Sequence, residues 1–330
     1  MTATRIIDDV GIVGLGAAGR RHVRILRSLR PNLTFSAYRT NKGGLREPVE
    51  GVANLDRDRF LSTRFDLLVI SNPSALHLDA LAMILPANPS AIILIEKPFC
   101  LPGEIQAMKA LMAAYPEARI LPGNCLRFHS AIVLLKEEME RGALGEPMEC
   151  HAHFGTYMPG WHPYEDYRTT YAARREMGGG ALLTSIHEID LVHHLFGDGE
   201  VLGAIADNIL LADIDVEDCA HAILSLRHCH ICNISLNFFE RPAQRYFKLV
   251  CRNGSFSWTF GESQVTMTLW KDGHPEPVCF PVDTSVDSMF LNMWQNVLNH
   301  SFQSFELGSV EASLRTVATI LARTEFKTCK

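Results

Sequence analysis

The chain has 330 residues, of which 47% are hydrophobic and 21% charged, a composition typical of globular proteins and long enough for two domains. A formal net charge of -6 excludes the broad basic surface that binds a nucleic-acid backbone. The start of the chain lacks the apolar core of a secretory signal, and no stretch of about 18 residues is apolar and uncharged. We therefore expect a cytoplasmic protein that binds neither nucleic acid nor membrane.

Short apolar runs alternate with helical patterns through the first third of the chain. The expected strands lie at 10–13, 33–38, 66–70, 91–95 and 118–121, and the expected helices at 17–29, 75–85 and 103–115. Strand, helix and strand in repeated order predict an α/β Rossmann fold, with a doubly wound and mostly parallel sheet.

The pattern changes after residue 123. A helical stripe that ends at Gly142 is followed by long β-like segments at 148–156, 201–211, 219–239 and 243–269, and a last helix is expected near 310–326. The triplets at 252–254 and 271–273 are typical of hairpin turns. We therefore divide the chain into domains 1–123 and 124–330, the second an α+β domain with an open, largely antiparallel sheet and a C-terminal helix that packs back on the body.

A glycine-rich loop separates the first expected strand from the first expected helix. Gly14 allows a tight turn, Gly16 allows the backbone to approach a pyrophosphate, and Gly19 allows close helix packing. Ala17 and Ala18 open the helix, whose N-terminus supplies N–H donors. The context predicts a dinucleotide site, and the alternative is a glycine-rich turn of an unrelated α/β fold.

The residues after the second expected strand bear on the choice of cofactor. A site that prefers NAD usually has an acidic residue there, which accepts a hydrogen bond from the ribose 2′-hydroxyl. Arg39, Thr40 and Lys42 stand there instead. Their donors suit a 2′-phosphate and favour NADP. The alternative is a solvated loop in an enzyme that uses either NADP or NAD. Most of the arginines of the helix at 17–29 are interpreted as a solvent face.

Lys97 follows an expected buried strand directly, and Pro98 prevents that strand from continuing. Ligands of a doubly wound sheet bind outside the carboxyl ends of its strands. Lys97 is therefore expected in the cofactor cleft. A purely structural pairing with Glu96 is the alternative.

At this point the sequence resembles the Gfo/Idh/MocA oxidoreductases, which include glucose-fructose oxidoreductase and inositol dehydrogenase. The resemblance covers nearly the whole chain, and its motifs are the glycine loop, Ser71-Asn72-Pro73 with His77, Glu96-Lys97-Pro98, residues 124–129 (NCLRFH), and Gly178-Gly179-Gly180 followed by His187-Glu188-Ile189-Asp190. It implies an NAD(P)-binding Rossmann domain, and a substrate domain whose open sheet commonly forms a homodimer or homotetramer. The cofactor-binding residues expected beyond the two loops above are Ser71, Asn72, Pro73, His77, Glu96, Lys97, Asn124 and Arg127.

The resemblance also implies catalytic roles. Lys97 would lie near the nicotinamide and the substrate hydroxyl, where a partly desolvated amine can move the hydroxyl proton. Family members often carry an Asp one helical turn before the histidine, whereas this chain has Leu183. His187 is still the expected second acid or base, with a structural histidine as the alternative, and Thr184 is a candidate to bond the substrate.

An aromatic and basic segment precedes the glycine triplet. Aromatic rings stack on sugar faces and arginines bind carboxylates or phosphates, so Trp161, His162, Tyr167 and Arg168 are candidate substrate contacts. Packing is the alternative for the aromatic side chains.

Nine scattered cysteines suggest reduced thiols rather than a disulfide framework. Strand alternation would place His228, His230 and Cys232 on one face and Cys229 on the other. Only three ligands would then converge, so we expect a polar sheet face and no metal site.

Together these features predict an NAD(P)-dependent dehydrogenase or reductase, NADP favoured, for a sugar, sugar acid, cyclitol or nucleotide sugar. One alternative is a glycosidase or lyase that uses transient oxidation by bound NAD(P). Another is an NADP-binding sensor without catalysis.

Overall fold

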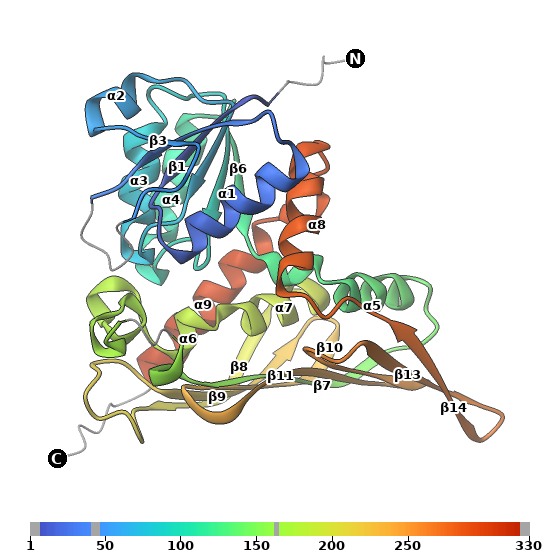
Figure 1. Ribbon diagram of the computed structural model, residues 1–330. Helices are drawn as coiled ribbons and strands as arrows, with labels where there is room; N and C mark the ends of the chain where they lie inside the picture. The colour runs from blue at the N-terminus through green and yellow to red at the C-terminus, as the bar shows by residue number, and fades with distance from the viewer. Residues whose placement is uncertain (1–6, 41–46, 162–164, 324–330) are drawn as a thin grey trace. The chain divides into compact units, whose positions relative to one another are not determined.

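The computed structural model describes residues 7–40, 47–161 and 165–323 (Figure 1). Two compact units form it. The first comprises Met1–Asn124 and Phe290–Leu307, and the second comprises Cys125–Met289 and Gly308–Lys330. None of the helices in the described ranges has the length and apolar character needed to cross a lipid bilayer.

Six parallel strands form the sheet of the first unit, in the order β3-β2-β1-β4-β5-β6. The strands are β1 (Asp9–Val13), β2 (Thr34–Tyr38), β3 (Val52–Asn54), β4 (Leu67–Ile70), β5 (Ile92–Glu96) and β6 (Arg119–Gly123). All residues of β4 and β5 are buried, which explains their continuous apolar runs. This strand order is that of the doubly wound dinucleotide fold, so the predicted Rossmann fold is confirmed.

The three helices predicted in the first third of the chain, at 17–29, 75–85 and 103–115, are present within two residues of their expected bounds. The helices are α1 (Ala17–Leu29), α2 (Arg57–Ser62), α3 (His77–Ile84) and α4 (Ile105–Ala114), with short 3₁₀ turns η1 (Ser74–Leu76), η2 (Pro102–Glu104) and η8 (Gln303–Phe305). Helix α8 (Val286–Leu298) was not predicted from the sequence. Most of its residues join the first unit, where Trp294 is fully buried.

Eight strands form the sheet of the second unit, in the order β14-β13-β12-β11-β7-β10-β9-β8. They are β7 (Pro147–Tyr157), β8 (Gly199–Asp207), β9 (Cys219–Leu226), β10 (Cys229–Asn237), β11 (Phe239–Cys251), β12 (Gly254–Thr259), β13 (Gln264–Lys271) and β14 (His274–Pro281). Only β7 and β10 pair in parallel, so the predicted largely antiparallel sheet is confirmed. Both predicted hairpin turns connect neighbouring strands.

Helices α6, α7 and α9 lie on one face of this sheet (Figure 1). The helices of the unit are α5 (Ser130–Glu140), α6 (Ala181–Thr184), α7 (Ile186–Phe196) and α9 (Gly308–Arg323), with 3₁₀ turns η3 (Cys125–Phe128), η4 (Met158–Gly160), η5 (Tyr167–Thr169), η6 (Tyr171–Ala173) and η7 (Arg175–Met177). We call the opposite side the open face. It exposes the large apolar side chains Ile205, Ile223, Ile231, Tyr246 and Trp270.

Candidate active site

The glycine loop between β1 and α1 has the shape that a phosphate-binding turn requires. Gly14 has a φ of +90°, and a Cβ there would lie 2.7 Å from the backbone nitrogen of Asn72. A Cβ at Gly19 would collide with the carbonyl oxygen of Gly14, whereas a Cβ at Gly16 would meet only open space. The loop therefore packs tightly at Gly14 and Gly19 and leaves the backbone at Gly16 accessible, next to Ala17 and Ala18 at the start of α1.

The segment after β4 is tied to this loop. The Ser71 hydroxyl donates to the carbonyl oxygen of Gly14 at 2.7 Å, and the Asn72 side-chain amide donates to the carbonyl of Leu76 at 3.3 Å. Pro73 precedes the short turn η1. Ser71 thus connects the ends of β1 and β4, the two parallel neighbours between which the strand order of the sheet reverses.

His77 connects the segments that follow β4 and β5. Its two ring nitrogens lie 2.9 Å from the carbonyl oxygen of Asn72 and 2.8 Å from that of Pro98. Burial lowers the pKa of His77, which is 1% exposed. A neutral ring can donate to only one of these two carbonyl oxygens at a time. Because its ring lies between both carbonyls, His77 links the two segments within the first unit.

The carboxylate of Glu96 fixes the backbone of Lys97. Glu96 is the last residue of β5 and is 8% exposed. One of its oxygens accepts from the backbone N–H of Lys97 at 3.0 Å, and the other lies 2.8 Å from Nε2 of His22. Burial alone would raise the pKa of Glu96, but the hydrogen bond from His22 and the nearby charge of Lys97 lower it. Glu96 is therefore ionised and holds Lys97 at the carboxyl end of the strand.

Two of the three predicted cofactor-specificity residues, the half-buried Arg39 and the exposed Thr40, are among the described residues. Arg39 donates to the backbone carbonyl of Glu47 at 3.3 Å, and Arg20 of α1 donates to the same oxygen at 2.5 Å. Thr40 is exposed and ends this described stretch, while Lys42 lies outside the described residues. The two arginines thus bring positive charge beside the end of β2.

Asn124 and Arg127 follow β6, and both are buried. Arg127 forms a bidentate pair with Asp190 of α7, with Nε and Nη2 at 2.7 and 2.6 Å from the two carboxylate oxygens. Nη2 also donates to the hydroxyl of Ser309, 2.7 Å away in α9. These donors are committed to the packing of η3, α7 and α9, and contact of Arg127 with a cofactor stays a prediction.

His187 lies in the first turn of α7 and is 7% exposed. Its Nε2 is 3.8 Å from the sulfur of Cys125. Thr184 ends the short helix α6, one turn before His187, and is also buried. Neighbouring acidic residues anchor α7, since Glu188 pairs with Arg245 of β11 at 2.7 Å and Asp190 pairs with Arg127. These two carboxylates therefore hold α7 in place.

Glu217 is a buried carboxyl beside the glycine triplet that was not predicted from the sequence. It accepts from the backbone N–H of Leu182 at 3.0 Å, and a Cβ on Gly180 would collide with it. Burial raises the pKa of Glu217 to about 7. The positive φ of Gly180 (+99°) and the absence of a side chain leave room for this carboxyl at the start of α6.

The predicted substrate contacts of the segment after β7 lie in different surroundings. The Trp161 indole donates to the hydroxyl of Thr156 at 3.0 Å and lines a shallow hollow with Tyr157, Glu240 and Arg241. Tyr167 donates to Asp213, and this hydrogen bond raises the pKa of Tyr167 to about 12. Arg168 is exposed and pairs with Asp166 at 2.6 Å. His162 is not among the described residues.

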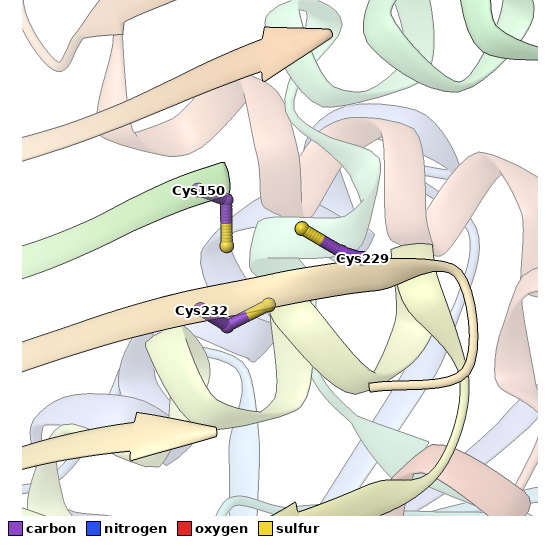
Figure 2. Close-up of side chains that lie close together, drawn as sticks. All are labelled: Cys150, Cys229 and Cys232. Carbon is purple, nitrogen blue, oxygen red and sulfur yellow. The ribbon is translucent and has the colours of Figure 1, made fainter. Parts of the chain in front are cut away.

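The expectation for the cysteine-rich strand was wrong. A β-bulge shifts the register of β10 between Cys229 and Cys232, which adds one residue opposite β9 and turns both side chains to the same buried side. Residue 232 also pairs with Cys150 of β7. Figure 2 shows the three thiols pointing toward one another, and their sulfur atoms all lie within 4.8 Å. His230 is instead exposed, so the predicted polar face does not contain Cys232.

Residues 132–257 match the family model of the GFO/IDH/MocA C-terminal domain. The 2,7-anhydro-N-acetylneuraminate hydratase of Escherichia coli strain K12 is 24% identical over 195 residues, 58% of this chain and 50% of that protein. The chain spans about half the length of the curated relatives it matches.

Solved structures resemble almost the whole chain. A levoglucosan dehydrogenase in complex with NADH has a TM-score of 0.79 at 14% identity, with 96% of this chain and 97% of that chain covered. A 3-ketoreductase from Actinomadura kijaniata, in complex with NADP and TDP-benzene, has a TM-score of 0.77 at 16% identity, with 97% of this chain and 99% of that chain covered. At these identities the similarity shows the fold.

The fold and the site define a two-unit protein in which a Rossmann sheet with a phosphate-type glycine loop accompanies a large open sheet. The similarity to the GFO/IDH/MocA C-terminal domain lies in residues 132–257, which belong to the second unit.

Proposed function

We propose that this protein is an NAD(P)-dependent oxidoreductase that favours NADP and acts on a secondary alcohol or ketone of a carbohydrate-type compound. The observation that carries the proposal is the position of Lys97. Its backbone is fixed by Glu96 at the carboxyl end of β5, in the sheet that also carries the glycine loop. Ligands of this fold bind at that edge.

The glycine loop fits a dinucleotide. Its backbone is accessible at Gly16 and closely packed at Gly14 and Gly19, and α1 points its N-terminal N–H groups at the loop. When bound, the nicotinamide group supplies or accepts the hydride. Arg39 and Thr40, together with Lys42, would bind a 2′-phosphate. Ser71, Asn72, Pro73 and His77 would line the same edge.

Lys97 and His187 would handle the proton of the substrate hydroxyl. An ammonium at Lys97 stabilises the oxygen as negative charge develops on it during reduction and gives it a proton, and the neutral amine takes that proton back in the oxidative direction. His187 is proposed as the second acid or base that exchanges this proton. Asn124 and Arg127 are proposed to contact the cofactor, and Thr184 is proposed to contact the substrate.

The substrate class rests on the side chains of the second unit. Trp161 and Tyr157 offer aromatic surface beside Arg241 in the hollow, and Tyr167 and Arg168 lie in the following segment. Rings of this kind stack on sugar faces, and a guanidinium binds a carboxylate or phosphate. Further support comes from solved neighbours named as a levoglucosan dehydrogenase and a 3-ketoreductase. A sugar, sugar acid, cyclitol or nucleotide sugar is therefore proposed.

A second candidate is a reaction without net redox change, in which oxidation by bound NAD(P) is transient. It is favoured by the curated relative named as a hydratase. In that case the cofactor stays bound and is not consumed. Reduced cofactor, followed by its absorbance, then does not accumulate during turnover.

We also propose that the protein is a cytoplasmic homo-oligomer. The apolar open face suits a homodimer or homotetramer through the sheet. All eight cysteines among the described residues are free thiols, in keeping with a cytoplasmic protein.

A substrate screen tests the activity. The protein would be mixed with NADP or NAD and a panel of polyols, keto sugars, sugar acids and nucleotide sugars, with reduced cofactor followed by absorbance and products by mass spectrometry. Turnover should be lost in Lys97→Ala and in His187→Ala while cofactor binding, measured by calorimetry, persists. Cofactor binding without turnover of any compound would instead indicate a sensor.

Cofactor preference has its own test. Arg39→Ala should raise the KM for NADP by roughly 10- to 100-fold, as expected for the loss of hydrogen bonds to a charged group, and change the KM for NAD little. Arg27→Ala is a matched control, because Arg27 lies on α1 and donates to the backbone of Glu50. An unchanged KM for NADP in Arg39→Ala contradicts the assignment.

A further inference from the structure

Three thiols that are distant in the sequence meet in the core of the second unit. Cys150 comes from β7, and Cys229 and Cys232 come from β10. Their exposures are 0%, 2% and 0%, and the three sulfur atoms lie within 4.8 Å of one another. We call these residues the thiol cluster (Figure 2). None of them belongs to the proposed active site.

Local structure, rather than sequence spacing, produces this cluster. In regular β-structure, side chains three residues apart point to opposite faces of the sheet. The bulge between Cys229 and Cys232 adds one residue opposite β9, so that both thiols reach the same side. The parallel pairing of β10 with β7 then places Cys150 directly beside Cys232.

The geometry matches a coordination shell of three sulfurs. Metal–thiolate bonds are about 2.3 Å long, so three sulfurs around one ion in a trigonal plane lie about 4 Å apart. The observed limit of 4.8 Å is close to that spacing. Soft sulfur ligands select soft ions, and among the described His, Cys, Asp and Glu side chains no fourth ligand joins the group. Structural zinc sites have four ligands, which argues against Zn²⁺.

We infer that the thiol cluster of Cys150, Cys229 and Cys232 is a binding site for one soft monovalent ion of the Cu(I) class, coordinated by three sulfur atoms. The site is independent of the proposed oxidoreductase activity. When the ion binds, S–H bonds are replaced by metal–sulfur bonds, the released protons pass to solvent, and no electron is transferred. A bound ion would connect β7 to β10 and stabilise the second unit.

The test uses the full-length protein without its exposed thiol. Cys279 is exposed and Cys329 lies outside the described residues, so a Cys279→Ser, Cys329→Ser background leaves the seven buried thiols. Under anaerobic conditions, Cu(I) would be titrated against a chromophoric Cu(I) chelator, and Ag(I) and Zn(II) would be titrated separately. We expect one equivalent of Cu(I), a rise in Tm with Cu(I) or Ag(I), and an X-ray absorption spectrum with three sulfurs at about 2.3 Å.

Single alanine variants locate the site. Cys150→Ala, Cys229→Ala and Cys232→Ala, each in the same background, should weaken Cu(I) binding by on the order of 100-fold and abolish the rise in Tm, because two sulfurs remain. Cys251→Ala is the matched control, since this buried thiol of the neighbouring strand β11 lies outside the cluster and should leave binding unchanged. Circular dichroism and unliganded Tm verify that each variant is folded.

Several outcomes would overturn the inference. Equal Cu(I) affinity in the parent and in the cluster variants would show that other thiols bind the ion. Zn(II) binding tighter than Cu(I), or a spectrum with four ligands, would contradict a three-sulfur site for a soft monovalent ion. Absence of stoichiometric binding in the folded parent would mean that the cluster is only a packed group of thiols.

Discussion

Nε2 of His22 lies 2.8 Å from a carboxylate oxygen of Glu96, and both side chains are buried in the Rossmann unit. The other ring nitrogen, Nδ1, accepts from the indole N–H of Trp294 at 3.0 Å. Because Nδ1 is occupied as an acceptor, Nε2 carries the proton and donates to Glu96. A chain of hydrogen bonds therefore runs from α8 through α1 to the backbone of Lys97, and the residue after β5 depends on a helix nearly 200 residues later in the sequence.

His22→Phe should show what this hydrogen bond contributes. The variant keeps an aromatic ring but leaves the Glu96 carboxylate buried without its donor, so we expect a loss of about 2–3 kcal/mol in the free energy of unfolding. If Glu96 positions Lys97, kcat should fall more than the KM for the cofactor rises. Urea unfolding and steady-state kinetics measure the two effects.

The pH dependence of this variant gives an independent check. The pKa of Glu96 is lowered in the folded protein, so its contribution to stability is present above its unfolded value of 4.5 and is lost as the pH falls through the folded value. The stability difference between wild type and His22→Phe should therefore shrink in acid. A difference that is constant from neutral to acid pH would show that lost packing, and not Glu96, is responsible.

The pH dependence of stability that Glu217 contributes should be opposite in sign to that of Glu96. Its pKa is raised from 4.5 to about 7 in the folded protein, so between these values the folded state binds more protons than the unfolded state, and stability falls as the pH rises. The shift corresponds to about 3 kcal/mol. Glu217→Gln should remove this loss, and unfolding free energies at pH 5 and pH 8 measure it. Glu137→Gln, at an exposed position of α5, serves as the control. Parallel curves for Glu217→Gln and wild type would contradict the buried, raised carboxyl.

The Rossmann half of the fold could be predicted because its signals are local. The helix at 17–29 begins directly after the glycine loop, and its predicted bounds are those of α1. The long strands of the second half were also recognisable, and the turns at 252–254 and 271–273 fixed two hairpins. In each case neighbouring residues determine the backbone conformation.

Contacts between distant residues could not be predicted from the sequence. Helix α8 itself could have been recognised, because Met289, Phe290, Met293 and Trp294 are at helical spacing. The hydrogen bond between Trp294 and His22 could not have been recognised, because residues 272 positions apart meet only through the tertiary fold. The same holds for the thiol cluster, since a bulge has no reliable sequence signature and strand order is needed to bring Cys150 to β10. Glu217 was missed because its role follows from burial.

Breaking the pair between Arg127 and Asp190 should be among the most destabilising single changes in the second unit. The two side chains are 1% and 3% exposed, so Asp190→Ala would leave a guanidinium buried without its carboxylate. We expect a loss of about 3–5 kcal/mol in the free energy of unfolding, measured by chemical denaturation. Asp166→Ala is the matched control, because its pair with Arg168 is on the surface and should change the unfolding midpoint little. Equal effects of the two variants would show that burial does not determine the strength of these pairs.

The open face of the large sheet should determine the oligomeric state. Ile205 and Ile223 are 58% and 46% exposed on adjacent strands, β8 and β9, and neighbouring apolar side chains extend this surface across the sheet. Association would remove them from water, which favours a homodimer or homotetramer. Ile205→Lys with Ile223→Lys places two charges in that interface, so light scattering coupled to gel filtration should show a shift to monomer. Val133→Lys, at a 42% exposed apolar residue of α5, is the control and should leave the mass unchanged. A double variant with the wild-type oligomeric mass would mean that assembly uses another surface, whereas a monomeric wild type would show that the open face has a different role.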